Sequence, residues 1–436
     1  LGHAAGPLRQ AVDGQLHEDA LSMQERLQAL WRMESPGLIA RLARMLGGDI
    51  GRAEELVQDC WLAALERWPL EGMPDNPGAW LMTAARNRAI DVLRQRQRIA
   101  GQHAQWGEML HPATASAPDD DDALGDDIGD DLLRLVFVAC HPVLSADARV
   151  ALTLRLLGGL TTQEIARAFL QPEPTIAQRI VRAKRTLERS QVAFEVPRSA
   201  ELPGRLHSVL EVVYLVFNEG YAASHGEDWM RPALCEEALR LGRGLGGRLT
   251  AHAAVHGLLA LMELQASRGA ARTDADGRAV LLEQQDRARW DWLQIERGLA
   301  ALQRARELRG DDDRYVLQAG IAACHARARV AAHTDWAAIA ALYDRLLQVQ
   351  PGPVVALNRV VAVLRAEGPL VAWGQLQPLL LEPRLQAHAP LWVVRGEVLA
   401  RLGRDEDARA AFLHAAGLSG NAREREALVA RADAFG

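Results

Sequence analysis

The sequence lacks most features that would place it among membrane, secreted or metal-binding proteins. Only 5% of its 436 residues are aromatic, only four are cysteine, and Lys184 is the only lysine among 50 basic residues. The cysteines form no CxxC pair and no zinc-ligand spacing, so a reducing compartment is favoured. No apolar run approaches the roughly 20 residues of a transmembrane helix, and residues 1–28 contain no apolar signal-peptide core. We therefore expect a cytoplasmic protein that needs no cofactor and no metal and has no membrane contact.

The abundant residues favour helix throughout the chain. Alanine, leucine, arginine and glutamate dominate, and runs of β-branched residues are scarce. The length allows about three domains. We predict an all-α protein with a helical domain over 22–100, a linker over 101–130, a second helical domain over 131–190 and a helical extension over 197–436.

The net charge of −6 conceals two basic segments. Residues 86–98 carry five arginines against one aspartate, and residues 149–189 carry eight basic residues against three glutamates. An acidic run rich in aspartate lies between them, from Asp119 to Asp131. The proline, serine and aspartate content of the linker predicts poor order. Two basic segments joined by an acidic linker are typical of a protein that binds DNA at two places.

The most informative motif is a helix-turn-helix between residues 161 and 187. Thr161 and Glu164 have the spacing of a capping box at the start of its first helix. The buried side of that helix would consist of Ile165, Ala166 and Phe169. Gln171 and Pro172 end it, because the residue before a proline avoids helical geometry.

The second helix of the motif has the composition of a DNA-recognition helix. Pro174 can open it, because the first helical turn needs no backbone N–H donor. Its apolar stripe is Ile176, Ile180, Ala183 and Leu187. Its opposite face carries Gln178, Arg179, Arg182, Lys184 and Arg185. Side chains of these types reach base edges and phosphates.

Three helices are predicted in the first domain. One covers residues 38–46 and ends near two glycines, a second covers 53–65 and ends at Trp68 and Pro69, and a third covers 79–97. A loop rich in turn residues, 71–78, separates the last two. The exposed face of the second helix is expected to carry Glu54, Glu55, Gln58 and Asp59.

An internal repeat runs through the last hundred residues. Trp392, Gly396, Ala408, Phe412 and Ala415 have the offsets of a tetratricopeptide unit, and a second set has the same offsets 36 residues earlier. That second set is Ala356, Val360, Ala372, Leu376 and Leu379. A third unit would begin at Val316 and close with residues 336–347. We predict tetratricopeptide-like repeats over about 316–430.

These segments resemble a known family. Residues 53–61 resemble region 2.2 of bacterial sigma factors, 76–81 with 85–94 resemble regions 2.3 and 2.4, and 161–187 resemble region 4.2. Their order and the absence of region 3 are similar to the extracytoplasmic-function (ECF) group of the sigma-70 family. Residues 126–142 and 209–221 further resemble the subgroup with a long C-terminal helical extension. One departure is Leu170, which stands where many members have glycine and which bears on the angle of the recognition helix.

The resemblance implies a function and its residues. It implies an alternative sigma factor that directs RNA polymerase core, through its β′ and β subunits, to promoters and helps to open the −10 region. Core binding would use Glu54, Glu55, Gln58 and Asp59. The −10 element would contact Asp75, Asn76, Trp80, Arg86, Asn87 and Arg94. The −35 element would contact Glu173, Thr175, Gln178, Arg179, Arg182, Lys184 and Arg185.

Other interpretations remain open at this point. The motif also fits a helix-turn-helix regulator with a repeat-based sensor, which would bind intact duplex without polymerase. An enzyme in the extension has no support, since the sequence contains no P-loop and no GxSxG, and no catalytic residues are predicted. His252 and His256 are expected to serve helix packing. Stacked helical hairpins commonly bind proteins, so we expect the extension to control sigma activity, either by contacting regions 2 and 4 or by binding a regulatory protein.

Overall fold

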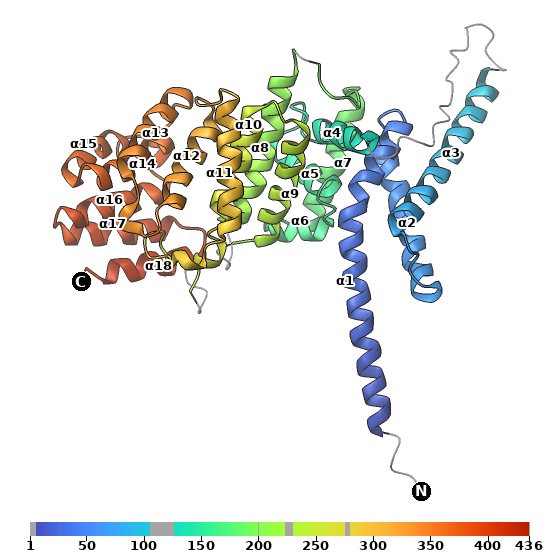
Figure 1. Cartoon of the computed structure of the whole chain (residues 1–436), viewed down its shortest axis with the longest axis horizontal. Helices are drawn as coiled ribbons and strands as arrows, with labels where there is room; N and C mark the ends of the chain where they lie inside the picture. The colour runs from blue at the N-terminus through green and yellow to red at the C-terminus, as the bar shows by residue number, and fades with distance from the viewer. Residues whose placement is uncertain (1–5, 105–125, 199, 223–229, 275–279, 436) are drawn as a thin grey trace. The chain divides into compact units, whose positions relative to one another are not determined.

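A computed structural model describes residues 6–104, 126–198, 200–222, 230–274 and 280–435 (Figure 1). All secondary-structure elements within these ranges are helices, which confirms the all-α prediction. The chain divides into two units, residues 1–167 with 171–212, and residues 168–170 with 213–436. The central part of the predicted linker, 105–125, lies outside the described residues.

The first unit begins with three long helices, α1 (Gly6–Met45), α2 (Ile50–Glu71) and α3 (Pro77–Ala104). They pack against one another around a core of Leu38, Ile39, Leu42, Leu56, Val57, Leu81 and Ala85. The helices are longer than predicted. In particular, α2 does not end at Trp68 and Pro69 but continues to Glu71, because Trp68 is buried in the core and anchors the last turn.

The same unit contains the second predicted helical domain. Its helices are α4 (Asp126–Ala139), α5 (Ala146–Leu156), α6 (Thr162–Ala168) and α7 (Glu173–Arg189). α4 packs on α1, and α5 packs on α7. Asp131, predicted as part of the acidic run, is fully buried beside Arg134 (2.5 Å) and Arg44 (3.3 Å). Burial raises the pKa of Asp131, although the surrounding arginines oppose that shift.

The boundary between the units falls within α8 (Leu202–Tyr221). Its first half belongs to the first unit: the Arg149 guanidinium donates to the Ser208 hydroxyl and pairs with Glu211 at 3.1 Å. Ser208 in turn donates to the Cys140 carbonyl at 2.6 Å. The segment that follows region 4 in sequence is therefore bonded to α4 and α5.

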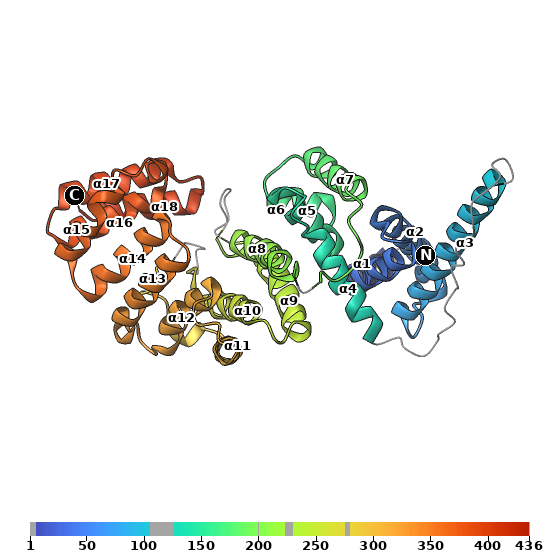
Figure 2. The ribbon, with the colours of Figure 1, turned by 90° about the horizontal axis from the view of Figure 1, so that it is seen from above.

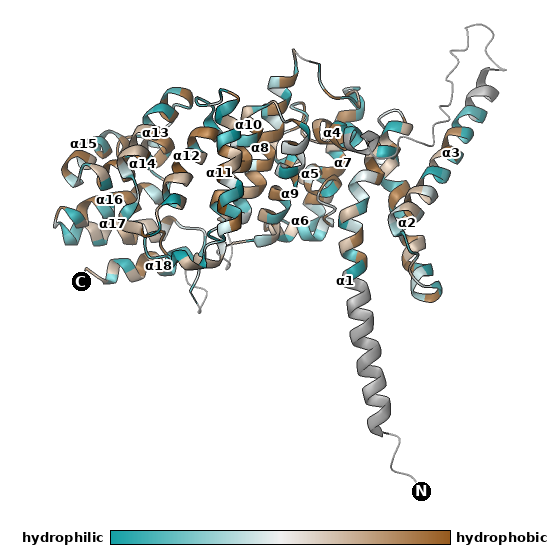
Figure 3. Ribbon diagram, viewed as in Figure 1, coloured by the Kyte–Doolittle hydropathy of each residue, from teal (hydrophilic) through white to brown (hydrophobic). Residues whose placement is uncertain are grey.

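The second unit is a succession of helices, each packed on its neighbours in sequence (Figure 2). They are α9 (Pro232–Arg248), α10 (Ala253–Ala266), α11 (Trp292–Glu307), α12 (Arg314–Arg327), α13 (Trp336–Val349), α14 (Pro353–Ala366), α15 (Pro369–Leu379), α16 (Ala389–Arg401), α17 (Asp405–Leu418) and α18 (Ala422–Asp433). Individual helices carry both hydrophobic and hydrophilic stripes (Figure 3). This amphipathic pattern is typical of helices packed on one side.

The predicted repeat positions fall on paired helices. In the last pair, α16 and α17, a Cβ on Gly396 would lie 2.8 Å from the Phe412 ring, so glycine is needed for the close approach. Phe412, Ala408 and Ala415 are buried. The equivalent residues of the preceding copy lie on α14 and α15. The assignment of these pairs as tetratricopeptide units stays a prediction.

Candidate nucleic-acid interface

The capping box at the start of the helix-turn-helix forms as predicted. The Glu164 backbone N–H donates to the Thr161 hydroxyl at 3.1 Å, and the Thr161 backbone N–H donates to the Glu164 carboxylate at 2.8 Å. Burial would raise the pKa of Glu164, but the hydrogen bonds from Thr161 and the charge of Arg32 outweigh it and lower that pKa. Two free N–H groups of α6 are satisfied in this way.

The turn between α6 and α7 contains the one departure noted in the sequence. Leu170 has φ of +49°, a conformation that favours glycine. The Gln171 N–H returns to the Ala166 carbonyl at 3.0 Å and closes the turn. Leu170 therefore adopts the left-handed conformation at the place where glycine is usual, at a cost of about 1 kcal/mol.

The predicted recognition helix α7 buries the apolar stripe that its sequence pattern predicted. Ile176, Ile180, Ala183 and Leu187 are all buried. Of the predicted −35 residues, Glu173, Thr175, Gln178, Arg182 and Arg185 are exposed. Arg179 lies 3.5 Å from Asp147. The first turns of α7 thus present acceptors, donors and positive charge to solvent, as direct base readout requires.

Lys184 is not part of that exposed surface. Its ammonium pairs with Glu54 of α2, whose other carboxylate oxygen accepts from Arg155 Nε at 2.7 Å. Glu54 is only 4% exposed, so its predicted position on an exposed face was wrong. The sequence could not reveal this, because the partners lie 101 and 130 residues away. Its neighbour Gln58 also donates to Glu54, at 2.8 Å.

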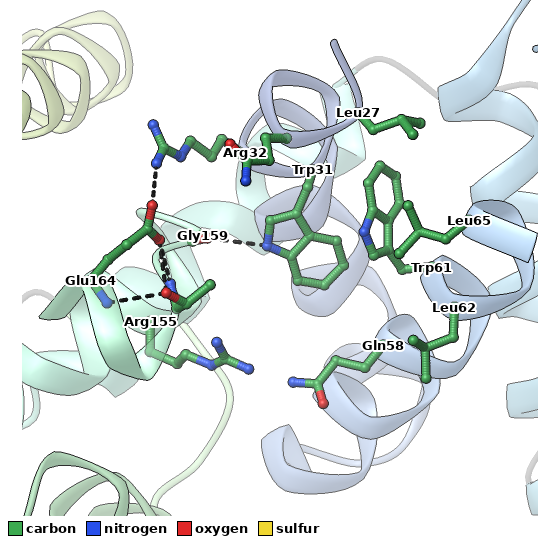
Figure 4. Close-up of a pocket in the computed structure, with 12 residues that line it drawn as sticks. Leu27, Trp31, Arg32, Gln58, Trp61, Leu62, Leu65, Arg155, Gly159 and Glu164 are labelled. Atoms are coloured by element: carbon green, nitrogen blue, oxygen red, sulfur yellow. Dashed lines mark hydrogen bonds and ion pairs between the residues drawn. The ribbon is translucent and has the colours of Figure 1, made fainter. Parts of the chain in front are cut away.

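Two further contacts join α1 to the start of the helix-turn-helix (Figure 4). Arg32 pairs with Glu164 at 2.6 Å, and the Trp31 indole N–H donates to the Gly159 carbonyl at 3.1 Å. Gly159 has φ of +63°, and a Cβ there would lie 3.1 Å from the Arg32 Cα of α1, which favours glycine at this position. Together with the Glu54 pairs, these bonds link the two predicted DNA-binding domains within the first unit.

A cleft of about 400 Å³ opens beside these bonds (Figure 4). Its apolar lining includes Trp31 and Trp61, whose ring centroids are 5.3 Å apart, and Leu62 and Leu65 of α2. Leu62 is 57% and Leu65 38% exposed. Trp31 and Leu62 were missed by the sequence reasoning, since single apolar residues next to a buried stripe carry no distinct signal.

The remaining predicted core-binding residues are accessible. The Glu55 side chain is 64% exposed and pairs with Arg52 at 2.9 Å. The Asp59 side chain is 59% exposed and lies 4.0 Å from Arg88. Exposed ion pairs of this kind contribute little to stability, so these carboxylates remain available to a partner.

The predicted −10 residues lie at the start and along the outer side of α3. Asp75 and Asn76 are exposed, and the Asn76 side chain caps α3 by accepting from the Ala79 N–H at 3.0 Å. Trp80 is half-buried against Trp68, with ring centroids 5.4 Å apart. The other three, Arg86, Asn87 and Arg94, are exposed. An Arg94 guanidinium nitrogen lies 3.7 Å from the carboxylate of Asp91, three residues earlier on the same helix.

Three segments match known family models. Residues 31–99 match sigma-70 region 2, residues 134–187 match sigma-70 region 4, and residues 205–306 match a family of unknown function, DUF6596. The chain belongs to the ECF group of the sigma-70 family. It is an alternative sigma factor, and its family works with RNA polymerase core and promoter DNA.

Similar proteins cover different parts of this sigma factor. An uncharacterized protein of Rhizobium meliloti is 41% identical over 394 residues, 90% of this chain and 91% of its own. A probable ECF RNA polymerase sigma factor, SigI of Mycobacterium tuberculosis, is 29% identical over 40% of this chain and 59% of its own. SigK of Mycobacterium ulcerans is 28% identical over 35% of this chain and 76% of its own. No solved structure matches.

The extension of this sigma factor contains no group of metal ligands among the described residues. The four cysteines are free thiols, and two are buried. No described helix is long and apolar enough to cross a membrane. His256 bonds the Thr250 carbonyl at 3.1 Å, which ties it to the turn before α10.

Proposed function

We propose that this sigma factor recognises promoters through two surfaces of its first unit. The exposed first turns of α7 read the −35 element as duplex, with Glu173 accepting from cytosine and Gln178 and Arg179 pairing with adenine or guanine. The loop before α3 and the arginines along α3 hold the −10 element while it opens. The observation that carries this proposal is the geometry of α7, whose apolar side is buried and whose polar first turns face solvent.

The core polymerase is proposed to bind the outer face of α2 through its β′ subunit. Glu55, Gln58 and Asp59 supply polar contacts on this face. The exposed Leu62 and Leu65 follow at helical spacing on the same helix, so the face combines apolar and acidic groups. A mixed surface of this kind fits a partner helix that carries both leucines and basic residues.

The region 2 and region 4 contacts imply a closed form. Glu54 and Lys184 satisfy each other in this structure. Neither can reach polymerase or DNA until the pair separates. We therefore propose that binding of core polymerase and promoter replaces the bonds of Glu54, Arg32 and Trp31 and lets the two regions reach separate promoter elements.

The extension is proposed to regulate this opening, either by acting on regions 2 and 4 or by binding a regulatory protein. A truncation that tests this should follow Val212, because the first half of α8 is bonded to α4 and α5. Full-length and truncated chains would be compared for transcription in cells under several conditions. Identical activity and identical regulation would contradict the regulatory role.

Run-off transcription with purified core polymerase tests the main proposal. Added sigma factor should produce transcripts from specific start sites, and mutation of either promoter element should abolish them. A chain that binds intact duplex tightly without polymerase, and selects no start site with it, would instead support the alternative of a helix-turn-helix regulator.

A further inference from the structure

The second unit contains a cluster of arginines and aromatic rings that the transcription function does not use. Arg268 and Arg272 flank the short helix η1 (Gly269–Ala271), and Arg287 begins η2 (Arg287–Arg289). They surround two rings, Tyr221 at the end of α8 and Trp290. We refer to these five residues as the arginine–aromatic cluster.

The cluster alternates cations with rings. Arg272 lies 3.6 Å from the Tyr221 ring centroid, and Arg287 lies 4.3 Å from that of Trp290. Arg268 lies within 6 Å of both rings. Arg272 and Arg287 are each 7% exposed and Trp290 is 3% exposed. Positive charge is therefore concentrated in a buried part of the fold.

In the part of the chain that the structure describes, two of these arginines have no acidic partner. Within the described residues, no carboxylate lies within 4.0 Å of Arg268 or Arg287. Arg268 donates to the Tyr221 hydroxyl at 2.6 Å, and Arg287 donates to the carbonyls of Ala328 (2.7 Å) and His325. Neutral acceptors like these orient a guanidinium but do not neutralise its charge.

Several buried donors in the cluster have no acceptor. Arg268 Nε, Arg287 Nε and the Trp290 indole N–H are buried without a hydrogen-bond partner in the described structure. Buried donors in folded proteins are almost always paired, and each exception calls for a water, an ion or a ligand. Two of these donors belong to arginines that lie over the Trp290 ring, and the third is the N–H of that ring.

Burial, together with repulsion between positive charges in the cluster, lowers the pKa values of Arg287 and of the neighbouring His325. Burial lowers the pKa of Arg287, and the charge of Arg268 lowers it further. Burial, with Arg268 and Arg287, lowers the pKa of His325 to about 4, so this histidine is neutral at pH 7. Buried like charges without counter-charge are costly, and bound anions relieve that cost.

We propose that the arginine–aromatic cluster binds a phosphate-type oxyanion between Arg268 and Arg287, beside Trp290. Guanidinium groups match the oxygen atoms of phosphate in geometry and charge. A purely structural role for Arg287 explains its bonds to two carbonyls. It does not explain the unpaired Nε donors of two arginines or the lack of an acid near both among the described residues, whereas a doubly charged oxyanion explains both.

Calorimetric titration of the full chain with inorganic phosphate tests the proposal, with sodium chloride at equal ionic strength as the reference. We expect saturable binding of one phosphate per chain and a rise in the thermal unfolding midpoint that chloride does not reproduce. A parallel titration with a nucleoside monophosphate identifies the source of the phosphoryl group. Tighter binding of the nucleotide indicates a phosphorylated metabolite, and equal binding indicates free phosphate.

Arg268→Met, which removes the less buried of the two arginines, should weaken phosphate binding at least about tenfold, the effect of losing a charged hydrogen bond. Arg345→Met is the matched control, because the Arg345 side chain is 43% exposed and already pairs with Asp312 at 2.6 Å. It should leave phosphate binding unchanged. Absence of saturable phosphate binding by the unaltered chain, or equal binding by both variants, would overturn the proposal.

Discussion

The contacts between regions 2 and 4 and the contacts within the C-terminal hairpins are built from different chemistry. Besides the packing of α4 on α1, the first set includes ion pairs and hydrogen bonds, with Glu54 between two cations and Arg32 on Glu164. The second consists of small and aromatic residues in close contact, with Phe412 against Gly396. A buried apolar cluster around Phe412 contains Leu399, Ala408, Ala415, Ala416, Leu428 and Ala432.

This difference indicates which of the two sets of contacts can separate when a partner binds. Exposed charged pairs such as Arg32 and Glu164 exchange readily for water, salt or a charged partner. Separating the buried pairs of Glu54 requires a partner that replaces them. An apolar hairpin core can separate only by exposing its surface to water, which costs about 25 cal/mol per Å². The polar bonds between regions 2 and 4 are thus replaceable, whereas the apolar packing of α4 on α1 and of the hairpin helices on one another separates only at the cost of exposing apolar surface.

The largest effect is expected for Phe412→Ala in the hairpin core. Phe412 is 1% exposed, so its truncation leaves a cavity and should lower the free energy of unfolding by about 3–5 kcal/mol. Denaturant unfolding followed by circular dichroism measures the change. Leu413→Ala is the control, because its side chain is 41% exposed and should cost less than about 0.5 kcal/mol. An equal loss of unfolding free energy in the two variants would show that burial of Phe412 in the hairpin core does not determine the stability of the extension.

Glu54→Gln should weaken the ion pairs between regions 2 and 4 and leave the hairpins unchanged. It leaves Arg155 and Lys184 without their shared carboxylate and should destabilise the closed form by about 2–3 kcal/mol, less than for a fully buried pair. Energy transfer between labels on α2 and α7 should fall, and unfolding of the hairpins should not change. Glu66→Gln, an exposed residue on the same helix, is the control. Unchanged energy transfer in Glu54→Gln would contradict the role of these ion pairs.

Arg179→Ala should act on DNA recognition without opening the closed form. Loss of one base contact costs about 1–3 kcal/mol, so −35-dependent transcription should fall about 5- to 150-fold. Affinity for core polymerase should stay the same, as measured by a binding titration. An equal loss of core binding and transcription would refute the assignment.

The smallest effect concerns pH. The pKa of Glu164 is lowered in the folded protein, so its contribution to stability is present above its unfolded pKa of about 4.5 and is lost as pH falls through the lower, folded value. Unfolding midpoints measured from pH 6 to pH 3 should decline. In Glu164→Gln this decline should be shallower, whereas identical slopes would contradict the assignment.

The sequence was sufficient where the structure is local and insufficient where it is not. Thr161 and Glu164, three residues apart, predicted a hydrogen-bonded cap that forms, and the period of Ile176, Ile180, Ala183 and Leu187 predicted a buried stripe. Glu54 has the same signal as any polar residue on an amphipathic helix. Its burial depends on cations more than a hundred residues away, which no local pattern encodes.

Addition of core polymerase to the labelled sigma factor tests the central claim most directly. If polymerase binding to α2 separates the Glu54 pairs with region 4, energy transfer between α2 and α7 should fall as polymerase binds, to the level of Glu54→Gln. Energy transfer that stays at its free value in a fully formed complex would contradict the account.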